Sequence, residues 1–211
     1  LFEQKPSVIV RLQQILNEYP YGGAVLYELV QNADDAQAQE VAFSLESFSD
    51  MEHHPLARSP ALLASNSAVF SATDLENIQN IGGTIDHNKR QDGSKIGRFG
   101  IGFNSVYHVA DLVAFVTGEY LCAFDPSCQH LVDHADTTKP VAGLSWKYLD
   151  VSQTSQPCTR DNPTFVDELL DVFERSGFGF KRIEPCQGSI FRLPLRTPPS
   201  KMCQEVHTVD N

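Results

Sequence analysis

Hydrophobic residues recur along this chain with two different periods, which locate its helices and strands. Helical spacing and capping signals predict one helix that begins near Val8 and is stopped by Pro20, and others over about 24–38, 73–80, 101–110 and 162–175. Short apolar runs predict strands over 41–47, 61–65, 112–116, 120–124 and 188–196. The polar region 125–160 fits neither pattern.

Two local signals refine this pattern. Thr73-Asp74-Leu75-Glu76 fits a capping box, with Thr73 and Glu76 as its two members, at the start of a short helix. Residues 82–96 contain three glycines and no apolar period, so we expect a mobile loop there.

The order of these elements indicates a fold class. Helices and strands mix without a regular strand–helix alternation, and no internal repeat appears. This order predicts an α+β fold with helices packed on one mostly antiparallel sheet. A chain of 211 residues is long enough for one substantial core. We expect a single domain over 1–211 that is part of a larger protein, because the chain opens without an initiator methionine.

Composition narrows the classes of partner. The formal net charge of −11 argues against a nucleic-acid surface, which requires clustered Lys and Arg. No apolar run approaches the roughly 20 residues that cross a bilayer, so we expect no membrane partner. Five cysteines without a C-x-x-C pair fit neither a disulfide framework nor a zinc site. They indicate free thiols in a reducing compartment, and we expect a cytoplasmic location.

The stretch ELVQNADDA places three polar side chains on one stripe of a helix. At about 100° per residue, Glu28, Asn32 and Asp35 fall within a narrow sector. We expect this stripe to lie opposite the apolar residues Leu26, Val30 and Ala33. The stripe faces either solvent or a pocket. In a pocket, a carboxylate can orient and deprotonate a water, and an amide oxygen is a ligand that Mg²⁺ accepts.

The stretch GRFGIGFNSVYH, residues 97–108, places three glycines directly before an apolar segment. Glycine weakens a helix by roughly 1 kcal/mol relative to alanine, so bare backbone is needed here. Backbone N–H groups of a glycine-rich turn at a helix start form an anion site. With the polar stripe, they describe a nucleoside-triphosphate site. The P-loop, dinucleotide and protein-kinase motifs are all missing from the sequence.

Together the two stretches resemble the N-box and the glycine-rich box of the GHKL (Bergerat-fold) ATPases. GRFGIGFNS is similar to the ninety-kilodalton heat-shock chaperones. With ALLASNSAVFSATDLENIQNIG between the two boxes, the chain most resembles the heat-shock protein 90-like modules of the sacsin family. The likeness covers about residues 5–125 and returns at 186–196. It implies a two-layer α/β sandwich with a mostly antiparallel sheet, which binds ATP and Mg²⁺ between helices and sheet.

The resemblance also implies roles for individual residues. Glu28 would be the catalytic base, Asn32 the Mg²⁺ ligand and 82–96 the lid. Hydrolysis would be at most weak and would need neighbouring domains, and client proteins or co-chaperones would be the protein partners. The implied nucleotide-binding residues are Asn32, Ala33, Asp35, Asn66, Lys95, Gly97, Arg98, Phe99, Gly100, Ile101, Gly102, Phe103 and Ser189.

One stretch departs from the family pattern. Where the family has D-x-G-x-G, this chain has Asn66-Ser67-Ala68-Val69-Phe70. A neutral amide accepts a hydrogen bond roughly half as strong as one to a carboxylate, and Phe70 replaces a small residue. Two functions therefore stay open. One is an ATP-binding, chaperone-like module, and the other is a degenerate Bergerat-fold domain that binds nucleotide weakly or not at all and acts as a protein-interaction scaffold.

Overall fold

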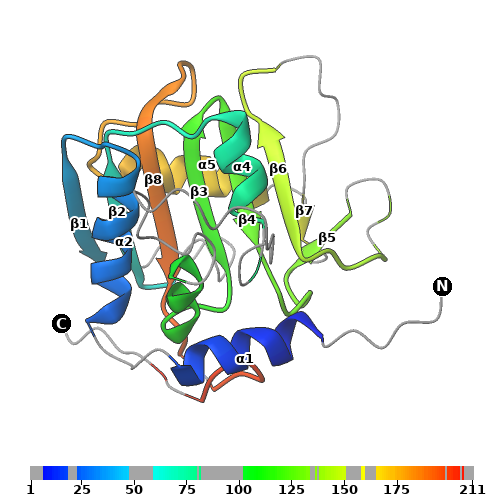
Figure 1. Cartoon of the computed structure of the whole chain (residues 1–211). Helices are drawn as coiled ribbons and strands as arrows, with labels where there is room; N and C mark the ends of the chain where they lie inside the picture. The colour runs from blue at the N-terminus through cyan, green and yellow to red at the C-terminus, as the bar shows by residue number, and fades with distance from the viewer. Residues whose placement is uncertain are drawn as a thin grey trace.

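The computed structural model describes residues 7–18, 23–47, 59–79, 81, 102–133, 136, 138–150, 158–159, 165–197, 199–204 and 206. Within them the chain forms an antiparallel sheet with helices on both of its faces (Figure 1). The predicted lid at 82–96 and the expected start of a helix at 162 lie outside the described residues. None of the described helices is long and apolar enough to span a bilayer.

The elements follow the hydrophobic pattern closely. The helices are α1 (Val8–Glu18), α2 (Ala24–Asp35), α4 (Ala72–Asn77), the 3₁₀ helix η1 (Phe103–His108) and α5 (Phe165–Arg175). The strands are β1 (Val41–Glu46), β2 (Ala61–Asn66), β3 (Val113–Gly118), β4 (Tyr120–Phe124), β5 (Leu131–Val132), β6 (Gly143–Lys147), β7 (Cys158–Thr159) and β8 (Cys186–Pro194). The prediction of an α+β fold with an antiparallel sheet is confirmed.

The strand order places the last strand of the chain in the middle of the sheet. Six strands run in the order β1-β2-β8-β3-β4-β6, and each neighbouring pair is antiparallel. β5 and β7 form a separate two-stranded ladder. β6 lies within the region 125–160, which the sequence pattern leaves without a prediction.

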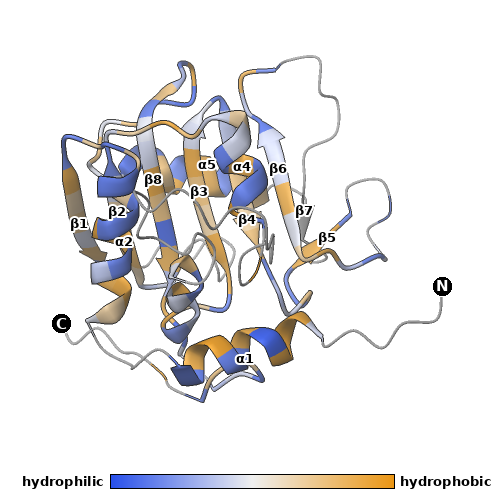
Figure 2. Ribbon diagram, in the orientation of Figure 1, coloured by the Kyte–Doolittle hydropathy of each residue, from blue (hydrophilic) through white to orange (hydrophobic). Residues whose placement is uncertain are grey.

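Two hydrophobic cores flank the sheet. On one face α1, α2 and η1 pack on β3 and β8, and Figure 2 shows the hydrophobic residues along α1 and β3. On the other face α5 packs its apolar residues against the sheet, through Phe165, Leu169 and Phe173. The expected two-layer arrangement is therefore wrong, because α5 adds a third layer.

Three helices differ in local detail from the sequence-based expectations. The capping box of α4 is formed by Ser71 and Asp74 instead of Thr73 and Glu76: Asp74 N–H donates to Ser71 Oγ at 3.2 Å, and Ser71 N–H donates to Asp74 Oδ2 at 2.9 Å. α2 ends three residues before the expected end because Gln37 adopts φ 59°, a left-handed conformation that ends a helix. The helix expected over 101–110 is the 3₁₀ helix η1, a geometry common in such short segments.

Candidate functional site

The polar stripe of α2 lies beside the buried face of the helix. Of the three apolar residues expected opposite the stripe, Ala33 is buried, whereas Leu26 and Val30 are 41% and 44% exposed. The buried residues of α2 are Val25, Leu29 and Ala33. Glu28, Asn32 and Asp35 are each partly buried at the border of this face. The side chains of the stripe are therefore only partly exposed to solvent, and they can contribute to a site on the protein.

The Glu28 carboxylate lies directly against Gly102. A Cβ added to Gly102 would overlap Glu28 Oε2. Gly102 has φ −62° and ψ −45°, which any residue can adopt, so backbone conformation does not require glycine here. Glycine is required because the neighbouring Glu28 carboxylate leaves no room for a Cβ. The structure thus joins the end of the glycine-rich segment to the residue expected to be the catalytic base.

Burial raises the pKa of Glu28, and the negative charge of Asp35 raises it further. A carboxyl with a raised pKa is better matched to proton transfer near neutral pH. The environment of Glu28 thus has the character expected of a functional carboxyl group.

Glu28→Gln is expected to raise the free energy of unfolding at neutral pH. Since the pKa of Glu28 is higher in the folded state, its favourable contribution is complete below the unfolded pKa and is lost as pH rises through the folded pKa. Glutamine has no such loss. Urea denaturation should show the variant more stable than wild type at pH 7, with a smaller difference at about pH 4.

The matched control is Glu40→Gln, at an exposed position. It should change stability little at either pH. An equal gain from Glu28→Gln at both pH values would contradict the assigned cause.

A pocket of about 90 Å³ lies between α2, α4, η1 and strands β2 and β8. Its walls include Leu29, Phe70, Phe103 and Phe191, together with polar groups. Three of the residues implied by the resemblance line it, namely Asn32, Asn66 and Phe103. Glu28 and Gly102, which contact each other, are the chain neighbours of the lining residues Leu29 and Phe103. Lys95, Gly97, Arg98, Phe99, Gly100 and Ile101 lie outside the described residues.

The other implied residues lie apart from this pocket. Ala33 is 1% exposed and belongs to the buried face of α2. Asp35 Oδ1 accepts a hydrogen bond from Gln31 Nε2 at 3.2 Å. Ser189 is fully buried within β8. The structure therefore gathers one part of the implied set at the pocket and leaves these three outside its lining.

Polar groups at one end of the pocket are engaged by the chain itself. Ala68 N–H donates to Asn66 Oδ1 at 2.9 Å, and Ser189 Oγ donates to the Ala68 carbonyl at 2.7 Å. The Thr117 hydroxyl lies 2.9 Å from Ser189 Oγ, and its oxygen accepts from Phe70 N–H at 3.0 Å. These bonds fix the segment that follows β2. Sequence reasoning missed Thr117, whose partners are distant in sequence.

The same segment places an aromatic ring in the pocket wall. The centroid of the Phe70 ring lies 5.5 Å from that of Phe115 and 6.1 Å from that of Phe191. Phe103 lies 5.9 Å from Phe191 by the same measure. Aromatic side chains thus form much of the apolar wall of the pocket, which Asn32 also lines.

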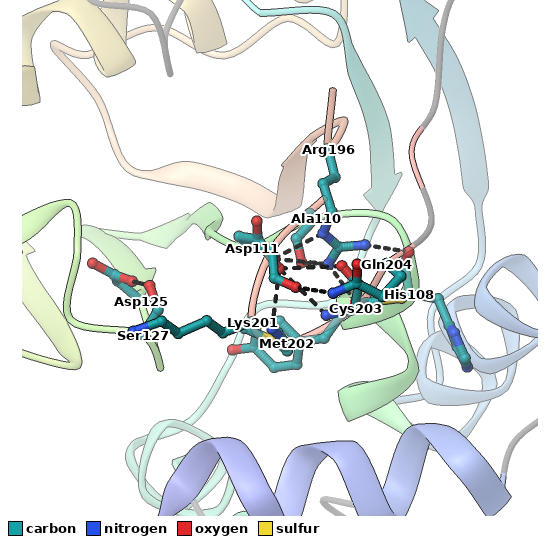
Figure 3. A network of polar contacts seen from close by, with 12 residues as sticks. His108, Ala110, Asp111, Asp125, Ser127, Arg196, Lys201, Met202, Cys203 and Gln204 are labelled. Atoms are coloured by element: carbon teal, nitrogen blue, oxygen red, sulfur yellow. Dashed lines mark hydrogen bonds and ion pairs between the residues drawn. The ribbon is translucent and has the colours of Figure 1, made fainter. Parts of the chain in front are cut away.

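A buried arginine holds the end of η1 (Figure 3). Arg196 donates from Nη1 to the His108 carbonyl at 2.7 Å, and from Nη2 to the carbonyls of Tyr107 at 2.7 Å and Ala110 at 3.1 Å. Its Nε donates to Asp111 Oδ1 at 2.9 Å. Cationic donors suit the negative end of a helix. Arg196 thereby positions η1, whose first residue, Phe103, lines the pocket.

A comparison with known proteins finds one family that covers nearly the whole chain. The Sacsin domain family model matches residues 5–210. Sacsin of Homo sapiens is 32% identical over 213 residues, which cover 96% of this chain and 4% of the human protein. The chain therefore spans a small part of the length of that relative.

Proposed function

Because the chain belongs to the Sacsin domain family, we propose that it is a chaperone-like module that binds a nucleoside triphosphate with Mg²⁺, ATP being the nucleotide that the resemblance implies. The observation that carries the proposal is the position of Glu28, whose carboxylate lies between α2 and Gly102, one helical turn from Asn32 at the pocket. This contact between Glu28 and Gly102, the last glycine of the glycine-rich segment, supports the proposal.

The residues present fit a metal–phosphate group at this end. An amide oxygen such as that of Asn32 is a hard ligand of the type that Mg²⁺ accepts beside waters and phosphate oxygens. Glu28, with its raised pKa, would orient and deprotonate a water. A bound Mg²⁺–nucleotide would supply the phosphoanhydride bond and neutralise the charge on its phosphates. We propose at most weak hydrolysis by this chain alone.

The pocket also suits a planar ring. Its apolar wall is formed by Leu29, Phe70, Phe103 and Phe191, with Asn66 as a polar group at the edge. Binding sites for small molecules combine such apolar walls with a few polar groups that fix orientation. A nucleoside base is a ligand of this type.

Isothermal titration of the chain with Mg²⁺–ATP tests the proposal. We expect binding in the wild type and about tenfold or more weaker binding in Asn32→Ala, because one interaction with a charged group contributes roughly 1.5–3 kcal/mol. Asn17→Ala, at an exposed position of α1, is the matched control and should bind as wild type does. Equal affinities of Asn32→Ala and wild type would remove Asn32 from the site.

A protein-interaction scaffold is the second candidate function. Its specific support is a group of exposed apolar side chains on α2 and the edge strand β1: Leu26, Tyr27, Val30, Phe43 and Leu45. Exposed apolar residues that cluster on a surface mark interaction sites. Complete absence of binding at millimolar ATP would favour this function. Client proteins or co-chaperones are the proposed partners, and a cytoplasmic location stays a prediction.

A further inference from the structure

β1 is the outer strand on one side of the six-stranded sheet, near α2 (Figure 1). The register of β1 and β2 continues through Glu40, whose carbonyl accepts from Ser67 N–H at 3.2 Å. Opposite residues of antiparallel strands alternate between hydrogen-bonded and non-hydrogen-bonded pairs, so the even-numbered residues of β1 bond to β2. The N–H and C=O groups of Val41, Phe43 and Leu45 therefore point away from β2. No strand among the described residues pairs with this edge.

The two faces of β1 differ in their chemistry. Val41, Phe43 and Leu45 alternate along the strand, so their side chains share one face, and all three are exposed. Val41 lines the pocket beside α2, which identifies this apolar face as the one on the α2 side of the sheet. Glu40 and Glu46, at even-numbered positions, lie on the opposite face.

The surroundings of this edge are acidic. The chain has no lysine or arginine between Arg11 and Arg58, a stretch that includes α2, β1 and several aspartate and glutamate residues. Glu46 pairs with Arg192 of β8 at 3.2 Å, whereas the exposed Glu40 forms no ion pair with the residues that the structure describes. Opposite charges on directly paired strand residues stabilise a sheet. A strand that adds to β1 is therefore stabilised by a lysine or arginine opposite Glu40.

We propose that β1 binds an extended segment of a partner protein as an added antiparallel strand, in which apolar residues alternate with lysine or arginine. This inference rests on the second candidate function, the protein-interaction scaffold, and it requires no bound nucleotide. In strand addition, main-chain hydrogen bonds provide affinity and alternate side chains provide specificity. Here the apolar side chains of the partner pack beside Phe43 and Leu45, and its basic side chains lie on the face of Glu40.

A second copy of this chain is a poorer partner for β1. Antiparallel pairing of two β1 strands about Phe43 brings Glu40 of one copy opposite Glu46 of the other. Like charges directly opposite each other destabilise a strand pair. The acidic face of β1 therefore favours a basic segment from a different protein.

Fluorescence anisotropy with a labelled peptide of alternating valine and lysine, as long as β1, tests the inference. In the antiparallel arrangement the valines lie opposite Val41, Phe43 and Leu45, so their N–H groups face β1, whereas those of the lysines face solvent. N-methylation of the valines should weaken binding about tenfold or more, because several main-chain hydrogen bonds are lost. The matched control peptide, N-methylated on its lysines, should keep most of the affinity.

A variant of the chain tests the charge. Glu40→Lys places like charges opposite each other and should weaken binding of the unmodified peptide about threefold or more. Glu18→Lys, at an exposed position of α1, makes the same change of charge and should bind as wild type does.

The outcomes separate this inference from both candidate functions. Equal affinities of the two methylated peptides would overturn strand addition and leave a side-chain interaction surface in place. Equal affinities of Glu40→Lys and Glu18→Lys would overturn the basic character of the partner. Absence of binding by the unmodified peptide would overturn the inference as a whole. Nucleotide binding is decided separately by the titration with Mg²⁺–ATP.

Discussion

Arg196→Leu is expected to lower the free energy of unfolding by about 3–5 kcal/mol, the range observed when one partner of a buried charged network is removed. The side chain is fully buried, and its guanidinium donates to three carbonyls at the end of η1 and to Asp111. Leucine fills part of the volume and supplies no donors. The carbonyls and the carboxylate then lose these partners in a buried region, which is costly.

Thermal unfolding followed by circular dichroism measures this effect. At roughly 2–4 °C per kcal/mol for a chain of this size, the melting temperature should fall by about 6–20 °C. The matched control is Arg182→Leu, whose partly exposed side chain pairs with Asp171 and Glu174. It should cost about 1 kcal/mol or less. Similar losses in the two variants would mean that the Arg196 network contributes no more than a surface ion pair.

Phe115→Ala is expected to cost about 3–5 kcal/mol, as found for large-to-small changes in packed cores. Phe115 lies on β3 with no exposed area. Its ring centroid is 5.2 Å from that of Phe191, 5.5 Å from that of Phe70 and 6.0 Å from that of Phe124. Alanine would leave a cavity among three rings, one strand away from the pocket.

Urea denaturation of the variant gives the loss of stability directly. Phe43→Ala is the control because it removes the same side chain from the edge strand β1, where the residue is already 38% exposed. We expect its cost to be less than half that of Phe115→Ala, since less area and fewer contacts are lost. An equal cost at both positions would show that the aromatic cluster around Phe115 adds no stability of its own.

Sequence patterns predict most of the elements because the sheet is apolar in short runs. The β3 and β4 runs are buried on both faces, so their residues are almost all apolar. β6 is only partly buried and mixes apolar with polar residues, which hides it within a polar region. α5 is visible as a helix, but nothing local indicates which face of the sheet it covers.

The candidate site was predictable where residues lie close in sequence. The spacing of Glu28 and Asn32 on one stripe follows from helix geometry alone. The exposure of Leu26 and Val30 depends on α2 lying near the edge strand β1 (Figure 1), which helical spacing does not reveal. The bond from Thr117 to Ser189 depends on strand pairing across 72 residues, and sequence pattern carries no signal for it.

The position of β8 also has a consequence for synthesis on the ribosome. β8 joins β2 to β3, yet it is the last of the six strands to emerge. Until Pro194 has left the exit tunnel, the β1–β2 hairpin and the β3–β4–β6 unit each keep an open inner edge. Such unpaired edges expose a nascent chain to aggregation. The six-stranded sheet therefore cannot form completely until its last strand, β8, has been synthesised.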